Sequence, residues 1–109
     1  TPLAEMAISN GLRAGLAMVA KTLADELGPM GIRVNSLMPG RIQTDRVMEL
    51  DTATGDPVQA RRQAEQLIPL GRYGQPTEFG RVAAFLLSPA SSYVTGVALP
   101  IDGGMLQAL

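Results

Sequence analysis

Apolar residues recur at helical spacing along the first quarter of the chain. Leucine and valine side chains fall three or four residues apart between positions 12 and 27, which is the period of a single helical face. The pattern predicts one long helix over residues 3–27. Gly28 and Pro29 end it, because neither residue continues a helix well, and Gly31 adds a second flexible point.

Two short runs bounded by turn residues predict strands. The first covers residues 32–37, is rich in β-branched side chains and feeds a turn at Pro39-Gly40. The second covers residues 96–101. Between them, residues 76–87 predict a helix whose apolar positions again follow a helical period.

Residues 45–70, which lie between the first strand and that helix, are the least regular part of the chain. Thr44 and Asp45 predict a cap for a short helix that runs to about residue 51. A second short helix is expected over residues 57–67. The order of elements is therefore helix, strand, irregular helical insert, helix and strand.

This order defines the fold class. Two strands joined by a helical crossover are expected to be parallel neighbours. Parallel strands are normally covered on both faces, which two strands and two or three helices cannot achieve alone. We therefore predict an α/β fold in which the chain is the C-terminal part of a larger doubly wound parallel Rossmann-like sheet. One strand must then offer an unpaired edge to the rest of that sheet.

Composition and charge narrow the function classes. Nine basic and ten acidic residues are scattered over the chain, so no cluster of positive charge favours nucleic acid or a membrane as a partner. No apolar run approaches the ~20 residues that span a bilayer. The absence of histidine and cysteine excludes histidine acid–base chemistry, a thiol nucleophile and a thiolate metal site, and we expect no metal. The chain opens on Thr1 in mid-pattern, and we expect it to be part of a longer protein.

Three stretches carry recognisable motifs. The first joins the end of the long helix to an Asn-x-x-x-Pro-Gly-x-x-x-Thr segment over residues 21–44. The second, residues 71–78, reads GRYGQPTE, and the third, residues 85–104, holds FLLS, SSYVTG and IDGG. In this order and spacing they resemble the short-chain dehydrogenase/reductase family, and are similar to its 3-oxoacyl-acyl-carrier-protein reductases. The resemblance spans nearly the whole chain.

The resemblance implies that the chain is the C-terminal half of a single Rossmann-like domain. Residues 1–44 would supply the active-site helix, a strand and the Pro-Gly turn, residues 45–70 a substrate lid, and residues 71–109 the last helix, strand and signature. The implied activity is hydride transfer between NAD or NADP and a small-molecule carbonyl or alcohol. Most of the cofactor site would lie in an N-terminal half of the same protein, and the resemblance implies a cytoplasmic homo-oligomer.

Within the Pro-Gly segment, the resemblance implies cofactor contacts. Pro39 and Gly40 would expose backbone groups at the carboxyl edge of the sheet, where ligands of α/β proteins bind. The main chain at Ile42 would bond the nicotinamide carboxamide, and the Thr44 hydroxyl would approach the amide or the pyrophosphate. A plainer interpretation is that Pro-Gly only turns the chain and Thr44 caps a helix.

The family's catalytic pair is a tyrosine and a lysine four residues later on one helical face. The tyrosine protonates the carbonyl oxygen, while the lysine holds the ribose hydroxyls and lowers the tyrosine pKa from its usual value of about 10. A gapless count back from Lys21 places these positions at Ser9 and Arg13. A rival register, Met6 and Asn10, needs three extra helical residues, a rotation of about 300°.

This departure from the family pattern leaves the function open. The Ser9 hydroxyl is a much weaker acid than a phenol and is shorter by a ring, while Arg13 can bind ribose hydroxyls but stays protonated. Ser9 could be a helix-face serine without a catalytic role, and Arg13 a solvated arginine. The alternative function is a catalytically impaired member that keeps nucleotide binding or an assembly role. A third hypothesis, an independent small binding domain, is disfavoured by the incomplete sheet.

The apolar residues of the insert also have two interpretations. They could line a substrate pocket beneath the lid, or they could only pack the insert against the domain. These residues are Val47, Met48, Leu50, Leu67 and Ile68. Arg61 and Arg62 are expected on a solvated helix face rather than in an anion clamp.

Small residues mark one face of the long helix. Gly11 and Gly15 lie four residues apart beside Ala14 and Met18, so a second helix could approach closely. Family members commonly pair this helix across a dimer axis, and the resemblance therefore implies a homo-oligomer through the Gly11–Met18 face. The same spacing could accommodate an intramolecular neighbour.

Overall fold

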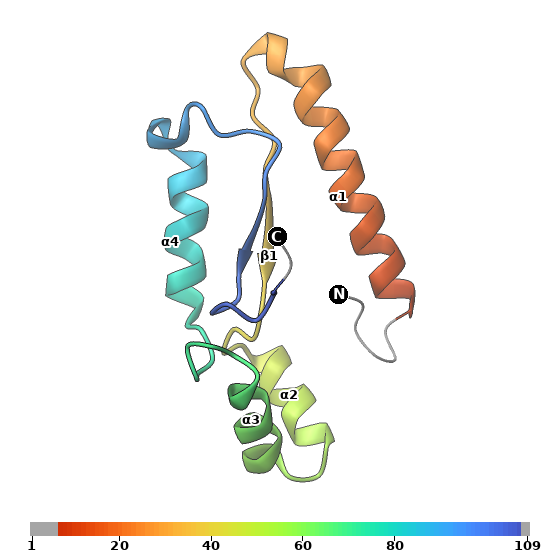
Figure 1. The fold of residues 1–109 in the computed structure, drawn as a ribbon, viewed down its shortest axis with the longest axis vertical. Helices are drawn as coiled ribbons and strands as arrows, with labels where there is room; N and C mark the ends of the chain where they lie inside the picture. The colour runs from red at the N-terminus through yellow and green to blue at the C-terminus, as the bar shows by residue number, and fades with distance from the viewer. Residues whose placement is uncertain (1–6, 108–109) are drawn as a thin grey trace. The chain divides into compact units, whose positions relative to one another are not determined.

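A computed structural model describes residues 7–107 (Figure 1). The chain divides into two compact units. The first holds the described residues up to Leu37 together with Phe85–Leu99, and the second holds Met38–Ala84 together with the described residues from Pro100. In chain order the elements are α1 (Ala7–Leu27), η1 (Gly28–Met30), β1 (Ser36–Pro39), α2 (Asp45–Ala53), α3 (Pro57–Gln66), α4 (Pro76–Leu87), η2 (Pro89–Ser91) and β2 (Ala98–Ile101).

Helix α1 confirms the long helix over its described part. The helix ends where the sequence predicted, and the short 3₁₀ turn η1 follows it directly. Gly31 closes this turn with a φ of 75°, in the left-handed region that favours glycine, and its N–H donates to the Gly28 carbonyl at 2.9 Å. No helix in residues 7–107 is long and apolar enough to cross a membrane.

Strands β1 and β2 pair with each other, as predicted. The Ser36 N–H donates to the Val97 carbonyl at 2.8 Å, and the Gly40 N–H donates to the Ile101 carbonyl at 3.0 Å. Both bonds keep the same offset between the strands, so the pairing is parallel. Because the sheet of the described residues has two strands, each of them has an unpaired edge.

The predicted strand boundaries were wrong at their N-terminal ends. The strands predicted from residues 32 and 96 begin instead at Ser36 and Ala98. Side-chain hydrogen bonds connect the residues that precede the two strands, where the strands have not yet begun to pair through their backbones. The Val34 N–H donates to the Thr95 hydroxyl at 3.0 Å, and the Asn35 amide bonds backbone groups of the opposite segment at 3.0 and 3.2 Å. These contacts are long-range, so the local β-branched pattern does not reveal them.

Arg33 fastens the C-terminal end of α4 in the first unit. Its guanidinium donates to the carbonyls of Leu86 at 2.8 Å, Ser88 at 3.4 Å and Val94 at 3.1 Å. A cation is favoured at this end of a helix, where the final carbonyls lack partners within the helix. Arg33 therefore connects α4 to the loop that leads into β2.

The second unit contains the short helices α2 and α3, which lie side by side (Figure 1). The structure confirms both and moves their ends slightly, because α2 continues to Ala53 and α3 stops at Gln66. Asp56 caps α3 by accepting the Gln59 N–H at 3.1 Å. The core of this unit consists of Ala64, Ile68 and Tyr73, with Val47 and Met105 packed against it.

Candidate functional site

The segment Pro39–Thr44, called the cofactor segment below, leaves the end of β1 in close contact with the C-terminal signature. A Cβ atom on Gly40 would lie 2.5 Å from the Cβ and 2.6 Å from the Cα of Asp102. No side chain fits at Gly40 without a shift of the backbone. The Asp102 carboxylate in turn accepts two backbone N–H bonds from the residues that follow it, at 2.9 and 2.8 Å. The Pro-Gly and Asp-Gly-Gly motifs therefore form one structure.

The backbone of Ile42 is presented by an isolated parallel bridge to Gly74. The Gly74 N–H donates to the Arg41 carbonyl at 2.9 Å, and the Gln43 N–H donates to the Gly74 carbonyl at 2.8 Å. Because successive residues of an extended chain direct their backbone groups to opposite sides, the Ile42 carbonyl faces away from Gly74. It can thus accept a carboxamide N–H. The backbone N–H of Ile42 is not free to bond the carboxamide in the same way, since it donates to the Gly40 carbonyl at 3.1 Å.

Thr44 is the N-cap of α2, which confirms the plainer interpretation of this residue. Its hydroxyl oxygen accepts the Val47 N–H at 3.4 Å. A hydroxyl also carries one donor hydrogen, and this hydrogen remains available to an acceptor such as a phosphate oxygen. Capping and cofactor binding by Thr44 are therefore compatible, and the cofactor contact stays a prediction.

Three of the five apolar residues of the insert, Val47, Met48 and Leu50, differ in exposure. Val47 packs against the core of the second unit, which supports the packing interpretation for this residue. Leu50 is half-buried, whereas Met48 is half-exposed and lines an open surface groove of about 530 Å³ along α2. The substrate contacts of all three residues stay predictions.

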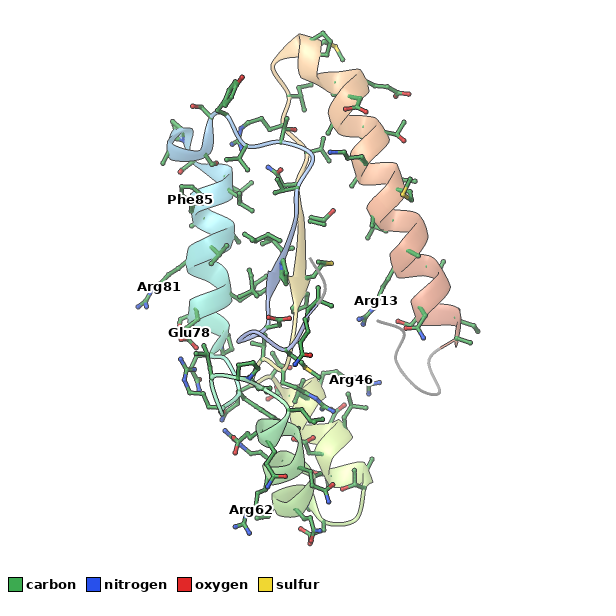
Figure 2. All side chains as sticks on the ribbon, viewed as in Figure 1. Arg13, Arg46, Arg62, Glu78, Arg81 and Phe85 are labelled. Atoms are coloured by element: carbon green, nitrogen blue, oxygen red, sulfur yellow. The ribbon has the colours of Figure 1, made fainter. Side chains whose placement is uncertain are left out.

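Ser9 and Arg13 both lie on α1, in the first unit. Ser9 is half-buried and Arg13 is exposed, with a side chain that extends from the helix (Figure 2). From the gapless register we expect both side chains to face the cofactor segment. That segment belongs to the second unit, so this stays a prediction. In the rival register, Asn10 is half-buried on the same helix and Met6 lies outside the described residues.

The small-residue face of α1 is open within the described part of the chain. A Cβ atom on Gly11 or on Gly15 would meet no atom of residues 7–107 within 4 Å. Met18 on the same face is exposed. Within the described residues no other segment approaches Gly11 or Gly15, and pairing with a second copy stays a prediction. Residues 7–107 also hold no cluster of acidic side chains that could bind a metal ion.

The GRYGQPTE motif forms one half of a capping box at the start of α4, in which the Glu78 carboxylate bonds the backbone N–H of Gln75. The Glu78 carboxylate accepts the Gln75 N–H at 2.7 Å and forms a two-bond pair with the Arg72 guanidinium, at 2.8 and 2.9 Å (Glu78 is labelled in Figure 2). The bonds from Arg72, and then the bond from Gln75, lower the pKa of Glu78 to about 2. The sequence marked this stretch as a motif but did not indicate the role of Glu78.

Glu78→Gln, made in the parent protein of which this chain would be the C-terminal part, is expected to reduce stability at neutral pH and to have a much smaller effect at pH 2. Because the folded-state pKa of Glu78 is depressed, its contribution is present above the unfolded-state pKa of about 4.3 and is lost as the pH falls through about 2. Thermal unfolding between pH 2 and pH 7 measures the difference. Glu49→Gln, in an exposed pair with Arg46, is the control and should follow the wild-type pH profile. Parallel profiles for wild type and Glu78→Gln would contradict the assignment.

A buried polar cluster in the second unit was not predicted from the sequence. Asp51 is 7% exposed and Tyr73 is 2% exposed, and the Tyr73 hydroxyl donates to the Asp51 Oδ2 at 2.8 Å. The Arg41 guanidinium lies 3.4 Å from the Asp51 Oδ1. Burial, and then the hydrogen bond to Asp51, raises the pKa of Tyr73 above its usual value, so the phenol is neutral at physiological pH.

Arg61 fits the expectation of a solvated arginine pair on α3 only in part, because its side chain is 40% exposed but also contacts Tyr73. Its guanidinium carbon lies 4.7 Å from the centroid of the Tyr73 ring, and its Nε donates to Glu65 at 2.8 Å. Arg62 is exposed, as expected (Figure 2). The contact between Arg61 and Tyr73 was not predicted because Tyr73 comes from a loop that the helical pattern of α3 does not include.

Comparison with known proteins places the chain in a family. The family model described as enoyl-(acyl-carrier-protein) reductase matches residues 3–106. A 3-oxoacyl-[acyl-carrier-protein] reductase of Thermotoga maritima is 45% identical over 94 residues, which cover 86% of this chain and 36% of that protein. The chain thus spans about a third of the length of the curated relatives that it matches.

Solved structures give the same result. YwfH, an NADPH-dependent reductase involved in bacilysin biosynthesis, has a TM-score of 0.94 and 34% identity, covering 99% of this chain and 43% of its own. An NADPH-bound short-chain oxidoreductase of Pseudomonas aeruginosa with an atypical catalytic centre has a TM-score of 0.85 and 32% identity, covering 100% of this chain and 42% of its own. With the motif geometry above, these matches confirm the resemblance and the Rossmann-like α/β fold class: the chain belongs to the short-chain dehydrogenase/reductase family.

Proposed function

We propose that this chain is the C-terminal part of an oxidoreductase that transfers hydride between NAD or NADP and the carbonyl or alcohol group of a small molecule. The observation that carries the proposal is the Ile42 carbonyl, which the bridge to Gly74 turns toward the side opposite that bridge. The relatives support it, because they include a 3-oxoacyl-[acyl-carrier-protein] reductase and NADPH-bound reductases.

The role of this chain in the reaction is to bind and orient the cofactor and the substrate. A bound nicotinamide cofactor supplies or accepts the hydride. The Ile42 carbonyl accepts a carboxamide N–H, and the Thr44 hydroxyl donates to the amide or the pyrophosphate. Arg13 donates to the ribose hydroxyls. Val47, Met48 and Leu50 belong to the lid, with Met48 as the side chain most available to a substrate.

Proton transfer distinguishes this function from its alternative. Reduction of a carbonyl needs a proton donor, and Ser9 is too weak an acid to replace a tyrosine directly. The donor would then come from the N-terminal half or from a bound water. The alternative is a catalytically impaired protein that keeps nucleotide binding or an assembly role. A short-chain oxidoreductase similar to this chain binds NADPH with an atypical catalytic centre, which supports cofactor binding in either form.

The parent protein, of which this chain would be the C-terminal part, provides the test. Mixing it with NADH or NADPH and 3-oxoacyl thioesters, ketones or aldehydes should give oxidation of the cofactor, measured by absorbance. Binding of either cofactor without turnover of any carbonyl would favour the impaired form. Absence of cofactor binding would overturn both functions.

Substitution of the catalytic positions should separate their two roles. Ser9→Ala in the parent protein is expected to reduce kcat by less than the factor of about 10² to 10⁴ that is typical of a general acid. Arg13→Ala should mainly raise the Kd of the cofactor, because it removes donors to the ribose. Arg62→Ala, at an exposed arginine of α3, is the control. A larger loss of kcat in Ser9→Ala, with unchanged cofactor affinity, would show that Ser9 takes part in the chemistry.

The assembly of the parent protein completes the proposal. The chain would pack against its own N-terminal half and pair with a second copy through the Gly11–Met18 face of α1. That face is exposed in the described residues and carries glycines with open space above them, which suits close helix packing. We place the protein in the cytoplasm.

A further inference from the structure

Tyr73 lies at the centre of the second unit and holds the end of α2. Its hydroxyl donates to the Asp51 carboxylate at 2.8 Å, and Arg41 approaches the other carboxylate oxygen at 3.4 Å. Asp51 lies in the last turn of α2, where the negative end of the helix dipole disfavours a carboxylate. Tyr73 and Arg41, rather than the helix itself, therefore hold Asp51 in its buried position.

The face of the same ring holds α3. The Arg61 guanidinium carbon lies 4.7 Å from the ring centroid, within the range of a cation–π contact. The Arg61 NH2 group also donates to the Gln43 side chain at 3.4 Å. The two helices of the expected lid thus both contact Tyr73. Helix α2 contacts its hydroxyl through Asp51, and α3 contacts its ring through Arg61.

The backbone beside Tyr73 holds the cofactor segment. The next residue, Gly74, exchanges two backbone hydrogen bonds with Arg41 and Gln43, at 2.9 and 2.8 Å. These bonds fix the plane of the intervening Ile42. A Cβ on Gly74 would lie 2.8 Å from the Ile42 side chain, so the two residues are in close contact. Any displacement of Tyr73 therefore moves the backbone that presents the Ile42 carbonyl.

We propose that Tyr73 is a positioning residue that couples the lid helices to the cofactor segment. A ligand that orders the lid would also fix Ile42, and a cofactor that binds Ile42 would order the lid. By thermodynamic linkage the two effects are equal in free energy. The proposal rests on the proposed function only in that the ligand of the cofactor segment is a nicotinamide cofactor.

Tyr73→Phe in the parent protein tests the coupling, because it removes the bond to Asp51 and keeps the ring. In the unliganded variant, amide hydrogen exchange should rise together in α2 and at Gln43 and Gly74, by roughly tenfold for the loss of a hydrogen bond to a charged group. Addition of NADPH should slow exchange in α2 and α3 of the wild type. The same addition should leave exchange in α2 of the variant unchanged.

Two further variants sharpen the test. Tyr93→Phe makes the same chemical change at a fully exposed tyrosine and should match the wild type. Arg61→Met keeps the length of the side chain but removes the cation above the ring and the bond to Gln43, so amide exchange should rise in α3 and at Gln43 while α2 stays protected. This second variant also decides the proposal if Tyr73→Phe does not fold.

The outcomes separate the coupling from the function. Faster exchange in α2 of Tyr73→Phe, with wild-type exchange at Gln43 and Gly74, would overturn the coupling, as would NADPH protection equal to that of the wild type. If the wild-type protein binds neither NADH nor NADPH, the proposed function fails. The exchange rates of the unliganded variants then still decide whether Tyr73 couples the two parts.

Discussion

Gly40→Ala is expected to destabilise the parent protein by about 3 kcal/mol and to weaken cofactor binding, because over-packing of this kind costs 1–3 kcal/mol or more. The added methyl group would lie 2.5 Å from the Cβ and 2.6 Å from the Cα of Asp102. One of these atoms belongs to the backbone, so a change of rotamer cannot relieve the clash. Either the cofactor segment or the C-terminal signature must move.

Both movements have a structural cost. A shift of Gly40 breaks its N–H bond to the Ile101 carbonyl and displaces Ile42, whose N–H donates to Gly40. A shift of Asp102 strains the two backbone bonds that its carboxylate accepts. Stability and cofactor affinity should therefore fall together, which urea unfolding and titration with NADPH can measure.

Gly80→Ala is the matched control for this substitution. Gly80 lies inside α4, and a Cβ there would meet no described atom within 4 Å. Alanine is favoured over glycine in a helix by up to about 1 kcal/mol, so this variant should equal or exceed the wild type in stability. If Gly40→Ala unfolds at the same urea concentration as Gly80→Ala, the close contact between the two motifs is wrong.

The sequence predicted the helices better than the strands because their signals are local. The spacing of leucines and the Gly28-Pro29 stop located the end of α1, and Pro76 located the start of α4. The starts of both strands depend instead on Asn35 and Thr95, which are far apart in the chain and meet only in the folded unit.

The candidate site divides in the same way. Gly40 was recognised by its motif, but the reason for a glycine is its approach to Asp102, which lies 62 positions later in the chain (102 − 40). The Asp51–Tyr73 pair escaped prediction because Asp51 belongs to no motif, and the motif that contains Tyr73, residues 71–78, does not indicate a partner for its hydroxyl. One signal was present: an acid in the last turn of a short helix is locally unfavourable and indicates a partner elsewhere.

The isolated chain, residues 1–109, is expected to lack a cooperative unfolding transition. Its accessible surface is 7991 Å², whereas a folded monomer of 11.5 kDa exposes about 5,800 Å². Large apolar side chains are among the exposed residues. On α1, Ile8 is 82% exposed, Leu12 71% and Leu16 67%, and these residues form one stripe along the helix.

A second exposed apolar surface adjoins the strands of the first unit. Small and apolar residues of α1 and of the segments around Ser36 and Val97 line a groove of about 190 Å³. The unpaired edge of β1 or of β2 adds backbone groups that can pair with another chain. Exposed apolar surface together with an open strand edge favours aggregation, so the chain should be ordered only when another part of the protein covers it.

Calorimetry and size-exclusion chromatography at micromolar concentration measure the outcome. The isolated chain should elute as aggregates and show no sharp heat absorption, while the parent protein should show one. The double variant Leu12→Gln, Leu16→Gln tests whether the apolar stripe on α1 causes the aggregation. It should make the isolated chain more soluble, because the stripe is exposed there. It should make the parent protein less stable, because we expect the stripe to be buried there. A sharp two-state transition from a monomer of residues 1–109 would contradict this expectation. The chain would then be an independent small binding domain, and the stripe on α1 would have to serve a partner other than its own N-terminal half.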